Sequence, residues 1–255
     1  MSEMQDDLRD DGFAAAMRAV ESIPGWLTDG QARMLYDAAG RLGPGQRIVE
    51  IGSHRGRSTI VFALAARPDV EIVAIDPFAR AERVDDVSMT DAEVGERDFE
   101  IFWGNLRDAG VDARVTHVRR TSADALEAVT GSVDLLYVDG AHDYASAVSD
   151  IRSWGSRVET GGTMLVHDAY SSVGVTAAQA VELFLSSRYR YVGRSRSLAE
   201  YRRTRVRGLA RIANAVRQLA PLPWFARNVL VKVAIARKVP VFARVLGHEG
   251  TDYPY

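Results

Sequence analysis

The sequence predicts an α/β protein with a doubly wound, mostly parallel sheet, a closing antiparallel pair of strands and a basic helical C-terminal extension. Three observations support this. Short β-branched runs alternate with segments of helical periodicity through the middle of the chain. The last two runs follow each other without a helix between them. The final quarter of the chain then combines apolar and basic residues at helical spacing.

The strand-like runs are short and bounded by turn residues, and they cover residues 47–52, 70–76, 113–118, 133–139 and 162–168. The helical segments between them include residues 58–66, 98–110 and 144–156. Strands that alternate with helices form parallel crossovers, which place helices on both faces of a Rossmann-like sheet. Residues 189–196 and 198–205 are the closing pair, and the longest stretch without a pattern is 79–96.

This pattern divides the chain into three parts. Residues 1–40 are expected to form an N-terminal helical segment, and residues 41–205 a single α/β domain. Residues 206–255 are expected to form a basic, amphipathic, helical extension that is interrupted at Pro221 and Pro223.

Composition excludes several kinds of protein. The chain has 255 residues, of which 47% are hydrophobic and 26% charged, as expected for a globular protein. It contains no cysteine, which excludes disulfides, zinc-thiolate sites and thiol nucleophiles. The acidic start, MSEMQDDLRDDGF, has no apolar core and resembles neither a signal peptide nor a transit peptide. These features predict a cytoplasmic protein.

Charge is distributed unevenly along the chain. Residues 194–248 contain 13 basic residues and one acid, Glu200, so this segment carries +12; the remainder carries −14, because the net charge is −2. Such a segment can dock on the core or on a second copy of the chain, which is the favoured interpretation and predicts a homo-oligomer. It can also contact a membrane surface. No stacking pattern of aromatic residues accompanies it, so nucleic acid is not an expected partner.

Polar side chains stand at the ends of four predicted strands. They are Glu50, Asp76, Asp139 and the adjacent pair His167 and Asp168. In a doubly wound sheet, ligands bind at the carboxyl ends of the strands. We therefore expect these groups to converge on one cleft. An acid at a strand end can also cap the following helix, and that alternative stays open.

The first of these strands leads into the sequence VEIGSHRGRST, in which Gly52 and Gly56 bracket a tight turn into a helix. Glycines let a backbone approach a ligand closely, and a helix N-terminus offers free amide groups. The spacing does not match a dinucleotide fingerprint. Asp76, 24 residues after Gly52, is placed to accept hydrogen bonds from ribose hydroxyls.

The order VEIGSHRG, VAIDPF, TSADAL, DLLYVDGAHDY and GGTMLVHDAY resembles class I S-adenosylmethionine-dependent methyltransferases over residues 48–205. The VDGAHDY and GG…HD pair is similar to the metal-dependent O-methyltransferases of small molecules, particularly those that act on sugar hydroxyls of macrolides. The resemblance implies S-adenosyl-L-methionine as cofactor. It also implies a cofactor-binding set in which Asp76 holds the ribose, with Glu50, Gly52, Ser53, Gly56, Ser58, Ser122 and Ala123 as the other members. Within this set Glu50 and the two glycines line the methionine portion, and Ser122 with Ala123 lines the adenine edge. His54 stands where many relatives have glycine.

The same resemblance implies a divalent metal. Asp139 and Asp168 supply the oxygen ligands that Mg²⁺ prefers, with Mn²⁺ as the alternative ion. His167 is the third candidate ligand; the similar sugar enzymes have an acid there, and an imidazole suits Mn²⁺ better than Mg²⁺. The alternative is that His167 points away from the ion. His142 lies three residues after Asp139, about one turn away, and is the candidate general base.

The resemblance implies an O-methyltransferase that acts on a hydroxyl of a sugar or a glycosylated small molecule, a mannoside being the narrowest candidate. Two alternatives remain. A metal-independent methyltransferase would not need the second aspartate. A non-enzymatic nucleotide-binding or scaffold domain would keep Gly52 and Asp76 but would not need His142 beside Asp139.

Overall fold

The computed structural model describes residues 2–79, 90–237, 239 and 244–247. One seven-stranded sheet runs through this part of the chain in the order β3-β2-β1-β4-β5-β7-β6. The strands are β1 (Arg47–Ile51), β2 (Glu71–Ile75), β3 (Val115–Val118), β4 (Val133–Val138), β5 (Val158–Val166), β6 (Tyr189–Ser195) and β7 (Leu198–Arg203). The first five are parallel, and β7 is antiparallel to both β5 and β6. The predicted fold class, including the closing antiparallel pair, is confirmed.

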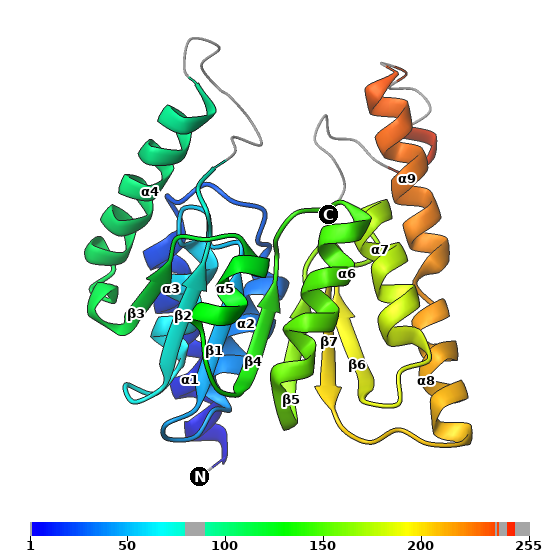
Figure 1. Ribbon diagram of the computed structural model, residues 1–255, viewed down its shortest axis with the longest axis horizontal. Helices are drawn as coiled ribbons and strands as arrows, with labels where there is room; N and C mark the ends of the chain where they lie inside the picture. The colour runs from blue at the N-terminus through cyan, green and yellow to red at the C-terminus, as the bar shows by residue number, and fades with distance from the viewer. Residues whose placement is uncertain (1, 80–89, 238, 240–243, 248–255) are drawn as a thin grey trace.

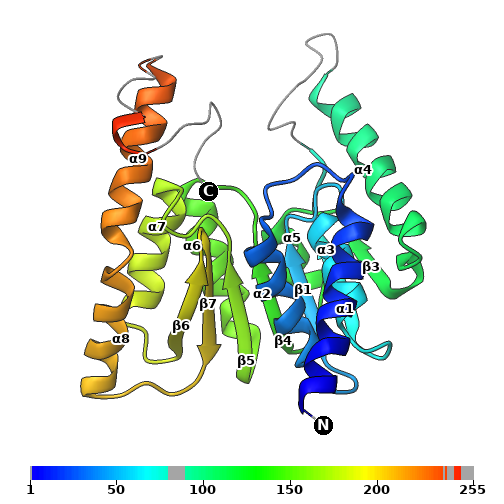
Figure 2. The ribbon, with the colours of Figure 1, turned by 180° about the vertical axis from the view of Figure 1, so that it is seen from behind.

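Helices cover both faces of the sheet (Figures 1 and 2). They are α1 (Ser2–Val20), α2 (Asp29–Gly40), α3 (Arg57–Ala65), α4 (Asp91–Asp108), α5 (Ser122–Ala128), α6 (Tyr144–Ser153), α7 (Val173–Gln179), α8 (Leu209–Leu219) and α9 (Leu222–Ala236). Short turns of 3-10 helix occupy Asp112–Arg114 and Gly155–Arg157, and a π-helical turn, Ala180–Phe184, follows α7.

Alternating strand residues pack into two separate cores. Ile48 and Leu135 point into the core beneath α1, α2 and α3, whereas Val49 and Leu136 point into the core beneath α5, α6 and α7. The fully buried Leu35 of α2 belongs to the first core. The N-terminal helices therefore share the core of the sheet.

One prediction about the loops was wrong. Residues 91–96, within the stretch expected to lack structure, form the first turns of α4. The side chain of Thr90 accepts a hydrogen bond from the Glu93 amide, and the Glu93 carboxylate accepts one from the Thr90 amide. This capping box defines the start of the helix, and its sequence, TDAE, was the signal that periodicity did not reveal. The rest of the expected loop, residues 80–89, lies outside the described residues.

The C-terminal helices lie along the edge of the sheet beyond β6 (Figure 1). They break at Pro221, as predicted, but the break expected at Pro223 is wrong: Pro223 lies in the first turn of α9, where a proline lacks no needed amide. The combined stretch Leu209–Ala236 is long and apolar enough to cross a membrane, by length and composition alone, and 22% of its apolar window is buried.

Candidate functional site

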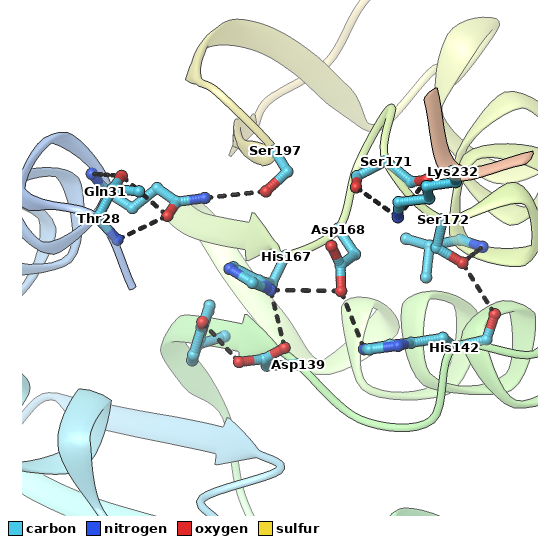
Figure 3. A network of polar contacts seen from close by, with 12 residues as sticks. Thr28, Gln31, Asp139, His142, His167, Asp168, Ser171, Ser172, Ser197 and Lys232 are labelled. Carbon is cyan, nitrogen blue, oxygen red and sulfur yellow. Dashed lines mark hydrogen bonds and ion pairs between the residues drawn. The ribbon is translucent and has the colours of Figure 1, made fainter. Parts of the chain in front are cut away.

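The topology brings the ends of β1, β4 and β5 together. The strand order reverses between β1 and β4, which is where doubly wound sheets bind ligands. The Asp139 amide donates to the Ile51 carbonyl at 2.9 Å, and the His167 amide donates to the Val138 carbonyl at 2.9 Å. Each strand end is thus held against its neighbour, and the polar residues that follow meet at one edge (Figure 3).

Two aspartates and two histidines form a cluster at this edge. His142 Nε2 lies 3.0 Å from Asp168 Oδ2, and His167 Nδ1 lies 3.0 Å from Asp139 Oδ1 and 3.7 Å from Asp168 Oδ2. One donor atom each from Asp139, His142 and Asp168 lies within 4.8 Å of the others, which is close enough to hold a single ion. The His142 side chain is 44% exposed, whereas that of His167 is 5% exposed. His142 therefore stands at the mouth of the cluster and His167 at its base.

The carboxylates govern the charge of the buried histidine. Burial would lower the pKa of His167, but the negative charges of Asp139 and Asp168 outweigh it and raise that pKa well above its usual value. Burial alone would likewise raise the pKa of Asp168, yet its cationic neighbours, His167 foremost, bring it to about 2. The Asp139 carboxylate also accepts a hydrogen bond from the Tyr137 hydroxyl at 2.8 Å. Both aspartates are therefore oriented acceptors.

The position of His142 differs from the sequence-based expectation. Residues 139–143 form a loop rather than a helical turn, and α6 begins only at Tyr144. The described contact of the His142 imidazole is with Asp168, not with Asp139. The loop is held by the Ser172 hydroxyl, which donates to the His142 carbonyl at 3.2 Å, and by the close approach of Gly174 to that carbonyl.

The predicted cofactor side begins at the turn after β1. Gly52 has φ 86°, and a Cβ there would lie 2.1 Å from the Asp139 carbonyl oxygen, so only glycine fits. Asp76 accepts hydrogen bonds from the amides of His54 and Phe78, each at 2.8 Å. Both of these residues have positive φ, 41° and 48°. Asp76 thus stabilises the left-handed conformations of His54 and Phe78.

Glu50 lies beneath this turn and is fully buried. Its carboxyl group accepts hydrogen bonds from the hydroxyls of Ser58 and Thr59 on α3. Burial raises the pKa of Glu50 to about 8, although the two hydroxyls act in the opposite direction. Ser53 is also buried, and its hydroxyl oxygen has no hydrogen-bond partner among the described residues. An orphaned polar atom at this turn fits a ligand that supplies the partner.

The predicted adenine edge lies at the start of α5. The Ser122 hydroxyl donates to Asp150, a buried aspartate whose pKa burial raises to about 6. Ala123 is exposed and lines a surface hollow together with Arg120, Asp124 and Glu127. Ala123 is therefore open to a ligand, whereas the Ser122 hydroxyl is already engaged. The cofactor roles of all these residues stay predictions.

Sequence reasoning missed three residues that support the site. Tyr137 lies in β4, two residues before Asp139, which directly follows the strand, so the two-residue alternation could have revealed it. Thr59 lies beside Ser58, and no pattern singled it out. Lys232 of α9 donates to the carbonyl and hydroxyl oxygens of Ser171, near Asp168 (Figure 3). Lys232 is one of only two lysines in an arginine-rich sequence, and this rarity is the feature that could have singled it out.

The cluster fits a divalent metal. Two carboxylates supply hard oxygen donors, and the imidazole of His142 completes a set that suits Mn²⁺ as well as Mg²⁺. Both ring nitrogens of His167 are buried. Nδ1 is paired with the carboxylates, at 3.0 Å from Asp139 Oδ1 and 3.7 Å from Asp168 Oδ2, whereas Nε2 has no hydrogen-bond partner within the described part of the chain. The three grouped donors include His142 and not His167, so His167 as a ligand stays a prediction.

Comparison with known proteins gives a consistent result. Residues 49–169 match a family model described as a methyltransferase domain. The uncharacterised protein y4gI of Sinorhizobium fredii is 30% identical over 125 residues, which are 48% of this chain but 13% of that protein. The chain thus spans a small part of this curated relative.

Two solved structures share the fold. Cofactor-bound Rv0187 from MTB is 21% identical, with a TM-score of 0.55 over 75% of this chain and 88% of that one. The O-methyltransferase TomG from Streptomyces achromogenes, involved in tomaymycin synthesis and solved with S-adenosylmethionine, is 20% identical. Its TM-score is 0.50 over 74% of this chain and 86% of its own.

Proposed function

We propose that the chain is a class I S-adenosylmethionine-dependent O-methyltransferase whose acceptor is a sugar or a glycosylated small molecule. The match of residues 49–169 to a methyltransferase-domain model supports the first part of this proposal. The observation that carries the proposal is the cluster of Asp139, His142 and Asp168 beside the glycine turn of β1. A mannoside is the narrowest acceptor that we propose.

The cofactor supplies a methyl group that its sulfonium already activates. The protein must therefore align an acceptor oxygen with that methyl group and exclude water. It must also remove the hydroxyl proton, because an alcohol is a weak nucleophile. The Gly52 turn and Asp76 are the proposed cofactor contacts, and they lie at the same sheet edge as the acidic cluster.

His142 is the proposed proton acceptor. Its exposed ring lies at the mouth of the cluster, where an acceptor can reach it. The contact between Nε2 and Asp168 favours the tautomer with hydrogen on Nε2, which leaves the lone pair of Nδ1 to accept the hydroxyl proton. Asp168 then stabilises the charged imidazole that results.

Asp139 and Asp168 are the proposed ligands of a divalent ion, either Mg²⁺ or Mn²⁺. Such an ion would lower the pKa of a sugar hydroxyl and orient it. Tyr137 and His167 hold the Asp139 carboxylate from two sides, so its orientation is set before any ligand arrives.

The test combines turnover with direct metal binding. With a panel of simple glycosides that includes mannosides, S-adenosylhomocysteine formation should stop after chelation and return with Mg²⁺ or Mn²⁺. Asp139→Asn and Asp168→Asn should each lose turnover and Mn²⁺ binding in calorimetry. Asp69→Asn, at an exposed acid remote from the cluster, is the control and should lose neither. Undiminished turnover after exhaustive chelation would refute the metal.

His142→Gln separates its two conceivable roles. A lost general base should lower kcat by about 100- to 10,000-fold while Mn²⁺ affinity stays unchanged. A fall in Mn²⁺ affinity would instead make His142 a ligand. Absence of turnover with every glycoside, while other hydroxylated acceptors are methylated, would refute the sugar acceptor.

A further inference from the structure

The first C-terminal helix has its polar side inward and its apolar side outward. The buried residues of α8 are Asn214 and Gln218. Leu209 is 83% exposed, and Ile212 and Val216 are each 58% exposed. With Leu219, also exposed, they follow the i, i+3, i+7, i+10 spacing of one helix face. A surface helix of a globular protein normally shows the opposite arrangement.

Hydrogen bonds to the sheet hold α8 in this orientation. Asn214 accepts from the Tyr191 amide at 2.7 Å and donates to the Tyr189 carbonyl at 3.2 Å, so it satisfies the backbone of the edge strand β6. Gln218 accepts from the buried Tyr201 hydroxyl at 3.0 Å. Rotating the apolar face inward would leave the backbone of β6 and the Tyr201 hydroxyl without these hydrogen-bond partners, and buried polar groups without partners are strongly unfavourable. The outward apolar face is therefore a stable feature.

The second C-terminal helix extends the apolar surface. α9 buries Asn228, Val231 and Ala234 and exposes Leu230 and Val233. Figures 1 and 2 show α8 and α9 one after the other along the same edge of the molecule. We call the exposed apolar residues of the two helices, together with the cations beside them, the C-terminal face: Leu209, Ile212, Val216, Leu219, Leu230, Val233, Arg207, Arg217 and Arg237.

The charge of this segment indicates its partner. Residues 201–247 contain eleven basic residues and no acidic one. Arg207, Arg217 and Arg237 are all exposed. A second copy docked through the same face would bring these cations together without any acid between them. An anionic membrane surface complements both the charges and the apolar stripe.

We propose that the C-terminal face docks on membranes with anionic headgroups, α8 and α9 lying in the plane of the interface. Exposed leucine, isoleucine and valine side chains enter the headgroup and acyl boundary, and the arginines contact lipid phosphates. The inward contacts of Asn214 and Gln218 remain intact, because only the outward face meets lipid.

Vesicle sedimentation of the full chain tests the proposal. Vesicles of phosphatidylcholine mixed with phosphatidylglycerol should bind the chain, and vesicles of phosphatidylcholine alone should bind it far less. High salt should weaken binding, since surface charges are then screened. Ile212→Gln combined with Val216→Gln should weaken binding about tenfold or more, because the variant has two fewer apolar side chains to transfer from water into the membrane interface. Leu64→Gln is the control: Leu64 is an exposed apolar residue of α3, distant from this face, and its loss should change nothing.

Both residues of the double variant are exposed, so circular dichroism should show an unchanged fold. Lack of binding to the anionic vesicles would overturn the proposal, as would equal binding by the double variant. Light scattering of the chain without lipid tests whether a second copy occupies this face instead, and a monomer is the expected result. A dimer in the absence of lipid that dissociates in the double variant would assign this face to self-association instead.

Discussion

Removal of the Asp76 carboxylate should affect stability and cofactor binding separately. In Asp76→Ala, the amides of His54 and Phe78 lose their acceptor. The His54 amide is at the exposed side of the turn, where water can replace the carboxylate. Phe78 is 6% exposed, so its amide stays unsatisfied. One buried unsatisfied amide predicts that the free energy of unfolding falls by about 1–3 kcal/mol.

Cofactor affinity should fall by a further, independent amount. Loss of a charged hydrogen bond to a ribose hydroxyl is worth about 1–3 kcal/mol, which corresponds to about 5- to 150-fold in the dissociation constant. Asp76→Asn keeps one carbonyl oxygen as an acceptor, so it should lose less of both quantities. Comparing the two variants in both measurements separates the effect of Asp76 on the stability of the loop from its effect on cofactor binding.

Urea denaturation measures the first quantity, and calorimetry with S-adenosylhomocysteine below the unfolding transition measures the second. The variants must remain folded at the calorimetric temperature, which circular dichroism establishes. Asp76→Ala with reduced stability but wild-type affinity would refute the ribose contact. Unchanged stability would refute the inference that Asp76 holds the Phe78 amide.

Two further predictions concern the His142 loop and the buried Glu50. Gly174→Ala should lower kcat about tenfold to a hundredfold, because the new Cβ would lie 2.3 Å from the His142 carbonyl oxygen and displace the loop. Gly104→Ala is its control, since a Cβ at Gly104 meets no atom within 4 Å. Equal kcat in both variants would contradict the reasoning. Glu50 has a folded-state pKa of about 8 against an ordinary 4.5, so its contribution to stability is fully present below pH 4.5 and is lost as the pH rises toward 8. The free energy of unfolding, measured by urea denaturation over this pH range, should therefore fall by about 1 kcal/mol per pH unit because of Glu50. Glu50→Gln should flatten this pH dependence. An identical slope in both proteins would show that Glu50 is charged in the folded state.

Local pattern was enough to predict the fold class and the strand-end residues. Residue type and spacing report on strands and helices because both depend on neighbours in the chain. The acids after β2, β4 and β5 were identified in this way, and parallel pairing then required Asp139 and Asp168 to meet at one edge. The start of α4 was missed because a capping box, and not periodicity, defines it.

Which histidine occupies which position was decided by tertiary structure. Both histidines stand near a strand end, and sequence placed His142 next to Asp139. The loop after β4, held by Ser172 and Gly174, carries His142 across to Asp168 instead. His167 continues the path of β5 and is buried between the two carboxylates.

By itself, the sequence determined that the chain is α/β, that acids gather at one sheet edge and that its last quarter is basic and amphipathic. Only the tertiary structure decided which face of α8 is buried. A helical period is the same whichever face turns inward, and hydrophobicity alone favours burying Ile212 and Val216. The edge of β6 requires hydrogen-bond partners, and Asn214 supplies them, so the polar face packs inward and the apolar face meets the surroundings.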